Sequence, residues 1–305
     1  MKRVLVTGAT GFVGSNALPL LPDRFDEVHA VSRASKENAG DVRWHRADLL
    51  NPNEAASLVA TVRPTHLLHF AWFVEPGAFW TSEENSRWFQ AGRSLVRAFV
   101  ECGGTRLVAA GTCGEYDWTG DGVCSEGETP LRPTSPYGVA KHALHGEIEA
   151  ILAGSGVTLG WGRIFFLYGP GEHPSRLVSW VVRRLLAEER AATTEGSQVR
   201  DYLHVEDVAG AFVALLGSDV SGAVNIASGE AISVGDLVTA IARKLSRGDL
   251  VDRGALPTPA GEPPRIVADV RRLSAEVGWS PRYTLDSGLD QTIGWWRSRL
   301  ARTAG

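Results

Sequence analysis

Apolar positions in the first half of the chain fall into short runs separated by longer amphipathic segments. Four of these runs are rich in aliphatic and β-branched residues and read as buried strands: RVLVTG, EVHAVS, HLLHFAW and RLVAAGT. The segments between them are long enough to form helices that cross from one strand to the next. This repeated order predicts an α/β protein with a doubly wound, parallel Rossmann sheet.

The second half continues this order and then changes. VTLGWGRIFFLYG predicts another strand, HVEDVAGAFVALLGS a helix, and GAVNIASG a later strand. From about residue 229 onward the pattern gives two short helices around the Pro/Gly-rich stretch GALPTPAGEPPRIVAD. We therefore predict a Rossmann domain over residues 1–170, to which 200–228 return. A smaller mixed α/β substrate-binding region would comprise 171–199 and 229–305.

A glycine-rich turn follows the first predicted strand directly. VLVTGATGFVGS places Gly8, Gly11 and Gly14 between that strand and a helix. Glycines in this context permit a tight turn, a close approach of the backbone to a pyrophosphate, and close packing of the helix on the strand. The sequence therefore predicts a dinucleotide site in this turn, with Phe12 and Val13 among its contacts.

The end of the second predicted strand bears on the choice of dinucleotide. Ser32 occupies the position where NAD-binding sequences carry an acid for the ribose 2′-hydroxyl, and Arg33 follows it. A guanidinium offers paired donors to a 2′-phosphate, which a carboxylate would repel. We expect NADP(H) to be favoured and NAD(H) to be possible. The alternative for Arg33 is an ordinary solvent-facing loop residue.

The stretch TSPYGVAKHAL places a tyrosine and a lysine on one face of a predicted helix. Ser135 suits the N-cap and Pro136 the first helical position, so Tyr137 and Lys141 would lie side by side one turn apart. A neighbouring cation favours a phenolate and brings the pKa of a tyrosine closer to that of a working general acid. Chance spacing on a structural helix is the alternative.

Composition removes several classes of function. A net charge of −4 and a pI near 6.1 give no general attraction to nucleic acid or anionic membranes. The chain enters its first strand at once, without a signal peptide, so we expect a cytoplasmic protein with no membrane partner. Cys102, Cys113 and Cys124 lack metal or disulfide spacing and are expected to be reduced thiols. His142 and His145 lack acidic or thiolate partners at metal spacing, so no metal is expected.

In order and in type, these motifs resemble the extended short-chain dehydrogenase/reductases of the NAD-dependent epimerase/dehydratase family, which act on nucleotide sugars. The likeness continues through RADLL, LLHFAW, AAGTCGEYDW, GRIFFLYGPGE, VRDYLHVEDVA and PRIVADVRRLSAEVGWSP, and covers nearly the whole chain. It implies a nucleotide-diphosphate sugar as substrate. It also implies a homodimer through paired helices, including the one that carries Tyr137.

The resemblance implies a catalytic set of Thr112, Tyr137 and Lys141. Tyr137 would exchange a proton with the substrate oxygen, while Lys141 would tune the phenol and bind the nicotinamide ribose. Thr112 would donate a hydrogen bond to the same oxygen or, alternatively, cap its own turn. Four further positions are implied cofactor contacts: Asp48, Leu49, Phe70 and Ala71.

On the substrate side, the resemblance implies that Arg200 and Arg265 bind the diphosphate, with a surface salt bridge as the alternative for each. Phe166 replaces an asparagine of the family. Asn85 either matches another family asparagine or lies on a helix surface. A group of aromatic residues either belongs to the core or forms an apolar wall for a deoxysugar methyl. From this group Trp72 is assigned to the substrate, and Cys113 is assigned to the substrate as well. The group comprises Trp72, Phe73, Phe79, Trp80 and Trp118.

These observations lead us to expect an NADP(H)-dependent reductase of a nucleotide-linked 4-keto-6-deoxy sugar. Dehydratases of the family resemble one another in an Asp-Glu pair directly after the catalytic threonine, whereas this chain has Cys113 and Gly114. Glu115 is expected to point to the opposite face of an extended segment. A 4-epimerase with retained NAD is the first alternative. The second is a non-catalytic NADP(H)-sensing protein that binds a partner protein, against which the intact catalytic set argues.

Overall fold

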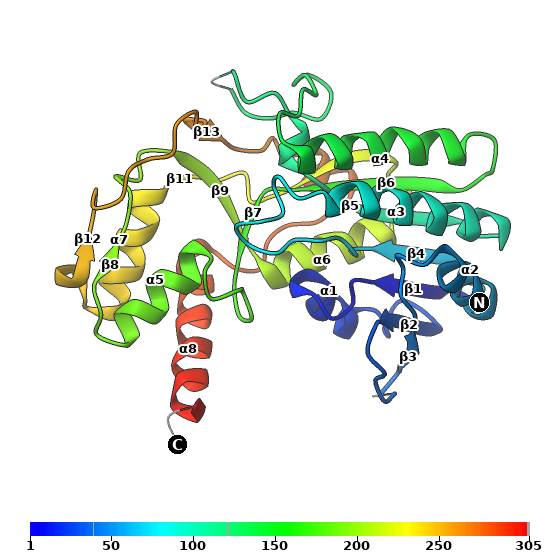
Figure 1. Ribbon diagram of the computed structural model, residues 1–305, viewed down its shortest axis with the longest axis horizontal. Coiled ribbons are helices and arrows are strands. Elements are labelled where there is room, and N and C mark those ends of the chain that lie inside the picture. The colour runs from blue at the N-terminus through cyan, green and yellow to red at the C-terminus, as the bar shows by residue number, and fades with distance from the viewer. Residues whose placement is uncertain (39, 121, 304–305) are drawn as a thin grey trace.

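The computed structural model describes residues 1–38, 40–120 and 122–303, which form two lobes (Figure 1). The larger lobe is built on a seven-stranded parallel sheet in the order β10-β6-β5-β4-β1-β2-β3. Its strands are β1 (Arg3–Thr7), β2 (Glu27–Ser32), β3 (Val42–Arg46), β4 (His66–His69), β5 (Arg106–Thr112), β6 (Thr158–Ile164) and β10 (Gly222–Ile226). The strand order reverses between β1 and β4, and sheets of this kind bind ligands beyond the carboxyl ends of the strands at such a reversal. The predicted doubly wound sheet is confirmed.

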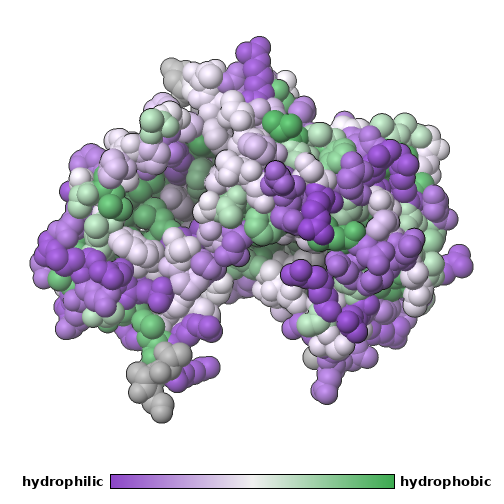
Figure 2. Space-filling model, in the orientation of Figure 1, coloured by the Kyte–Doolittle hydropathy of each residue, from purple (hydrophilic) through white to green (hydrophobic). Residues whose placement is uncertain are grey.

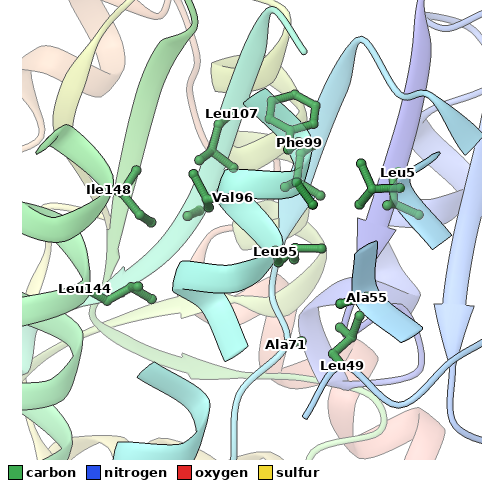
Figure 3. Close-up of a cluster of buried hydrophobic side chains, with 14 of the residues drawn as sticks. Leu5, Leu49, Ala55, Ala71, Leu95, Val96, Phe99, Leu107, Leu144 and Ile148 are labelled. Atoms are coloured by element: carbon green, nitrogen blue, oxygen red, sulfur yellow. The ribbon is translucent and has the colours of Figure 1, made fainter. Parts of the chain in front are cut away.

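Helices cover both faces of this sheet (Figure 1). On one face lie α2 (Pro52–Val62), α3 (Glu84–Glu101) and α4 (Pro136–Leu152), and on the other α1 (Phe12–Ala17) and α6 (Val205–Leu216). Figure 3 shows part of the hydrophobic core between the sheet and the helices α2, α3 and α4. There Leu95, Val96 and Phe99 of α3 lie near Leu107 of β5, and all four side chains are fully buried. Each such side chain contributes about 1.5–3 kcal/mol by burial, which keeps α3 and α4 firmly on the sheet.

The smaller lobe contains two short sheets and three helices. Strand β9 (Val199–His204) pairs in parallel with β7 (Phe166–Tyr168) and β13 (Arg265–Ile266), and antiparallel with β11 (Ala231–Ser233). The remaining elements of this lobe are β8 (Ala191–Ala192), β12 (Val251–Asp252), α5 (Leu177–Leu186), α7 (Val234–Leu245) and α8 (Leu285–Thr303). Four short helical turns complete the chain: η1 (Leu18–Leu20), η2 (Cys113–Glu115), η3 (Gly248–Leu250) and η4 (Arg272–Glu276).

The chain returns from the smaller lobe to the central sheet through α6 and β10. Because β9 pairs within the smaller lobe, this return starts at α6. The division into a cofactor-binding and a substrate-binding region stays a prediction. Among the helices of the described residues, none is both long and apolar enough to cross a membrane.

A large cavity lies where the two lobes meet. Figure 2 shows the molecular surface indented between them, and the cavity has a volume of about 1460 Å³. Its lining comes from the carboxyl ends of β1, β2, β4 and β5, from the start of α4, and from α5, β9 and α8 of the smaller lobe. The site predicted from sequence therefore has to be sought here.

Candidate active site

One side of the cavity is formed by the backbone of the glycine turn after β1. Gly8 has a positive φ of 65°, and a Cβ on it would lie 2.7 Å from the backbone nitrogen of Ala71. A Cβ on Gly14 would lie 2.2 Å from the carbonyl oxygen of Gly8. Because side chains at these positions would collide with backbone, only glycine lets the turn fold this tightly against β4 and α1. The result is a concave surface of the kind that accepts a pyrophosphate.

Every position predicted to meet the cofactor lines this cavity. These positions are Gly8, Gly11, Phe12, Val13, Gly14, Ser32, Arg33, Asp48, Leu49, Phe70, Ala71, Tyr137 and Lys141. We refer to the stretch from Gly8 to Gly14, together with Ser32, Arg33 and Asp48, as the cofactor wall. The residues present therefore fit a dinucleotide, and their contact with one stays a prediction.

The end of β2 supplies a basic corner of the cofactor wall. The Ser32 hydroxyl donates to the carbonyl oxygen of Ala34, while Arg33 is exposed at the rim of the cavity. Arg46, at the end of β3, donates its Nε to the carbonyl oxygen of Arg33 over 3.3 Å. Two guanidinium groups thus lie near the position where an acid would bind a ribose 2′-hydroxyl.

The three predicted catalytic side chains come together at the floor of the cavity. Thr112 ends β5, and α4 places Tyr137 and Lys141 beside it; all three are buried. As predicted, Ser135 caps α4, accepting a hydrogen bond from the Gly138 backbone nitrogen at 3.1 Å. The Tyr137 hydroxyl is hydrogen-bonded to the Thr112 side chain. The helix start therefore fixes the phenol next to the threonine.

The electrostatics of Tyr137 differ from the expectation. Burial raises the pKa of Tyr137 well above its ordinary value. The hydrogen bond with Thr112 and the charge of Arg176 act in the opposite direction, but they do not offset the effect of burial. The expected tuning of the phenol by Lys141 stays a prediction, and the Lys141 side chain has partners of its own. Its Nζ donates to the Ala110 carbonyl oxygen at 2.8 Å and lies 3.9 Å from the ring centroid of Trp72. Burial lowers the pKa of Lys141 to about 7.

The turn after Thr112 corrects a second expectation. Residues Cys113–Glu115 form the helical turn η2 instead of an extended segment, because Thr112 and Glu115 make a reciprocal capping box. The Thr112 hydroxyl accepts from the Gly114 backbone nitrogen at 3.1 Å, which leaves its own proton free for another acceptor. It therefore caps its own turn and still faces the cavity. Glu115 does point away from the cavity, into the protein interior.

Aromatic rings surround the phenol of Tyr137. The rings of Phe79 and Trp80 meet it edge-on, with centroids 4.9 and 5.5 Å away. The indole nitrogen of Trp118 donates to the Cys113 carbonyl oxygen at 3.0 Å. Phe79 belongs to the core, and all five predicted aromatic residues line the cavity, so their role as an apolar wall for a sugar methyl stays a prediction. All three cysteines are free.

Asn85 is buried and does not lie on a helix surface. It is 2% exposed, and its Oδ1 accepts from the indole nitrogen of Trp72 at 2.9 Å. Its Nδ2 donates to the carbonyl oxygens of Phe79 at 2.7 Å and Ser82 at 2.9 Å. The helix-surface alternative is therefore wrong. Asn85 fixes the aromatic segment 72–82 against α3.

The two predicted diphosphate ligands are placed differently. Arg200, in β9, lines the cavity with its guanidinium over the Phe166 ring and paired with Glu262. Arg265 lies on β13 opposite Val199 and, within the described ranges, is not among the residues that line the cavity. The structure thus brings Arg200 to the site but does not bring Arg265 there.

Sequence reasoning missed several charged residues that line the cavity, among them Arg176, Glu172 and Glu262. Arg176 precedes α5, lines the cavity and lies over the Phe79 ring, 5.2 Å from its centroid. Glu172 is buried, with its Oε2 accepting from the backbone nitrogen and hydroxyl of Ser179, and burial raises its pKa to about 7. The sequence feature that could have revealed Arg176 and Glu172 is the charged cluster GEHPSR, which follows the end of β7. We refer to Trp72, Trp80, Arg176, Arg200 and Glu262 as the substrate wall.

A parallel sheet with a glycine turn after its first strand, and a buried Thr-Tyr-Lys set at the reversal of strand order, define a Rossmann-fold enzyme of the extended short-chain dehydrogenase/reductase class. Residues 4–227 match the NAD dependent epimerase/dehydratase family. The chain belongs to this family, whose members among its relatives are epimerases, dehydratases and reductases of nucleotide sugars.

Individual relatives resemble the chain over its length. MoeE5, solved with UDP-glucose and NAD, is 32% identical with a TM-score of 0.84, covering 98% of this chain and 99% of that one. UDP-glucuronic acid decarboxylase 1 of Xenopus tropicalis is 27% identical over 99% of this chain and 74% of its own length. A dTDP-4-dehydro-6-deoxy-D-allose reductase of a Streptomyces species is 26% identical over 97% of this chain and 96% of its own. The named reactions differ, so the reaction of this chain has to be argued from its own residues.

Proposed function

We propose that this protein reduces a nucleotide-linked 4-keto-6-deoxy sugar with NADPH. The observation that carries the proposal is the arrangement around Thr112: the side chains for proton transfer to a ketone oxygen are together, and the positions after Thr112 carry no acid that faces the cavity. A relative named as a reductase of a dTDP-4-dehydro-6-deoxy sugar supports the substrate class.

The chain's own residues divide the work of reduction. When bound, the nicotinamide supplies a hydride to the carbonyl carbon. The hydroxyls of Thr112 and Tyr137 would both hydrogen-bond the ketone oxygen, and Tyr137 would donate its proton as that oxygen becomes an alcohol. The raised pKa of Tyr137 keeps the phenol protonated and ready to donate. Phe79 and Trp80 exclude water from the reacting atoms and offer an apolar face to the sugar methyl.

Dehydration of an intact sugar needs an acid to protonate the leaving hydroxyl, and the turn η2 has none in place. Gly114 carries no side chain, and a Cβ there would lie in van der Waals contact with the Trp80 ring, at 3.4 Å. Cys113 offers only a buried thiol, which is a far weaker acid than the carboxylic acid that dehydration requires. Glu115 is turned into the interior, where Arg163 binds it.

A second candidate is a 4-epimerase that retains its cofactor. It is favoured by the NAD found in the solved structure of MoeE5, and it needs the same three catalytic side chains. Ser32 in place of an acid, with Arg33 beside it, supports NADP(H) and hence an exchanging cofactor, which suits net reduction. A homodimer through α3 and α4, which pack side by side on the larger lobe, is part of the proposal.

The test is an assay of the purified protein with NADPH or NADH and 4-keto-6-deoxy sugars linked to dTDP, CDP, GDP or UDP. We expect loss of absorbance at the reduced nicotinamide band with one nucleotide series, and no such loss with a Tyr137→Phe control. Separately, intact nucleotide-diphosphohexoses are incubated without reductant and analysed by mass spectrometry. A product lighter by one water would refute the proposal in favour of a dehydratase, and an isomer of equal mass would favour the epimerase.

A further inference from the structure

A charged carboxylate lies directly behind the catalytic threonine, outside the cavity. Glu115 is 0% exposed. Its Oε1 accepts from the Thr112 backbone nitrogen at 2.9 Å and from the Trp161 indole nitrogen at 3.0 Å, and its Oε2 accepts from Arg163 Nε at 3.0 Å. Gly111 leaves room for this arrangement, since a Cβ there would lie 2.7 Å from Glu115 Oε1.

The partner of this carboxylate is itself anchored deep in the sheet. Arg163, on β6, is 1% exposed and donates its Nη1 to the Tyr116 hydroxyl at 3.1 Å. That hydroxyl donates to Asn225 Oδ1 at 2.7 Å, on the neighbouring strand β10. The pair therefore joins the end of β5, where Thr112 lies, to two further strands of the central sheet.

The same carboxylate is connected to the helix that carries the other two catalytic side chains. The Trp161 ring stacks on His145, with centroids 4.7 Å apart and planes inclined by 7°. His145 lies one turn after Lys141 on α4. Glu115 thus contacts β5 through Thr112 and reaches α4 through Trp161. A shift of this one side chain would be felt by both elements that form the catalytic set.

We propose that Glu115, held by Arg163, is a positioning residue that aligns Thr112 with the helix of Tyr137 and Lys141. The Glu115 charge also raises the pKa of Lys141, against the effect of burial. A buried ion pair is weak grounds for stability, because its desolvation cost often matches its attraction. Because this ion pair lies directly behind the catalytic set, we assign it a role in function instead. The charge effect can be measured on the protein alone, whereas its effect on turnover rests on the proposed reductase.

The groups that face Lys141 and Tyr137 determine the sign of the electrostatic effect. Burial lowers the pKa of Lys141, and Glu115 is the group that raises it again. His69, packed against the ammonium, has its own pKa lowered to about 3 by burial and by Lys141, and so stays neutral. Around Tyr137, burial, Cys113 and Glu115 raise its pKa, while Thr112 and Arg176 lower it. Removing the Glu115 charge therefore lowers the pKa of Lys141 and that of Tyr137 together.

The decisive variant is Glu115→Gln, which keeps the shape and an oxygen acceptor for Thr112 but removes the charge. Competitive labelling of amines with trace acetic anhydride, read by peptide mass spectrometry across pH, gives the pKa of Lys141 without any substrate. We expect that pKa to fall below its wild-type value. Glu126→Gln is the matched control, because Glu126 is a half-buried carboxylate that accepts from the Asn225 backbone nitrogen at 2.7 Å, beyond Arg163 and Tyr116. It should leave the Lys141 pKa unchanged.

In the reductase assay, Glu115→Gln should lower kcat by about ten- to hundredfold while KM for the nucleotide sugar stays within about threefold. The alkaline limb of kcat/KM should move to lower pH, because the proton donor is lost at lower pH once its pKa falls. An unchanged Lys141 pKa in folded Glu115→Gln would overturn the proposal. A lowered pKa in a protein that reduces no 4-keto sugar would instead count against the proposed function alone.

Glu115→Gln leaves the Arg163 guanidinium buried without its counter-charge, which can unfold the protein. The double variant Glu115→Gln/Arg163→Met removes both charges and avoids that cost. It should fold, as judged by near-ultraviolet circular dichroism. Its Lys141 pKa should lie between those of the wild type and Glu115→Gln, because the lost Arg163 cation had opposed the Glu115 charge. A wild-type kcat in the folded double variant would refute the positioning role assigned to Glu115.

Discussion

The cofactor wall and the substrate wall face each other across one cavity, yet they are built in different ways. The cofactor wall is largely backbone: Gly8 and Gly14 shape it by lacking side chains, because any Cβ would collide with the main chain. The substrate wall is made of side chains from segments far apart in sequence, such as Trp72 before α3, Arg176 before α5 and Arg200 in β9.

This difference explains which of the two walls can change its specificity. A backbone surface tolerates few substitutions and accepts the pyrophosphate common to all dinucleotides. A side-chain surface can be altered one residue at a time, and Phe166, which lies under the Arg200 guanidinium, is a position where such a change would act. We infer that the choice of nucleotide sugar resides in the substrate wall and that only the corner at Arg33 selects the cofactor.

The largest effect is expected where the two walls meet. Tyr137→Phe removes the proton donor and little volume, so turnover should fall by about 10² to 10⁴ fold. Cofactor binding, followed by quenching of the tryptophan fluorescence, and the melting temperature should stay near wild type. Retention of more than a few per cent of the activity would show that Tyr137 is not the acid.

The next largest effect concerns the corner of the cofactor wall. Arg33→Ala should weaken NADPH by about ten- to hundredfold, because a charge-assisted hydrogen bond contributes about 1.5–3 kcal/mol. NADH has no 2′-phosphate and should bind almost as before. Titration of both cofactors by isothermal calorimetry measures the ratio. Equal losses for the two, or a wild-type preference for NADH, would contradict the assignment of Arg33.

How far the sequence predicts the site follows from the same comparison. The glycine turn and the Ser135 cap of α4 are determined by neighbours in the chain, so their motifs predict them correctly. We expected the residues of η2 to be extended, because they follow a strand directly. The alternation of residues along a strand does not show that Thr112 and Glu115 will pair in a capping box. Arg200 depends on Glu262, which is distant in sequence, and Asn85 depends on the irregular segment just before its helix, so helix or strand periodicity predicts neither arrangement.

A smaller effect is expected from Asn85, which braces the substrate wall. Asn85→Leu leaves the Trp72 indole nitrogen and the Phe79 carbonyl oxygen without their partner. Each unsatisfied buried group costs about 1–3 kcal/mol, so the free energy of unfolding should fall by at least about 1 kcal/mol in urea titrations. KM for the sugar should rise while NADPH affinity holds. Asn38→Ala, at an exposed hydrogen bond to Trp44, is the control and should change neither quantity. Unchanged stability in Asn85→Leu would remove the bracing role.

The smallest effect is expected at Glu262, and it has the opposite sign. Arg200 is buried and lines the cavity, where we propose that it binds the diphosphate, yet its guanidinium is paired with the Glu262 carboxylate, which is 31% exposed. A phosphate and this carboxylate would compete for one cation, so Glu262→Gln should bind a nucleoside diphosphate more tightly.

The gain is bounded by the weakness of such partly exposed pairs, which contribute about 0–1 kcal/mol, so we expect about a two- to fivefold lower Kd. Calorimetry with UDP and dTDP measures it. Glu188→Gln, which removes the exposed partner of Arg247, should leave the Kd unchanged. Weaker binding by Glu262→Gln would mean that the carboxylate orients Arg200 for the phosphate instead of competing with it, and the substrate wall would then be rigid before the ligand arrives.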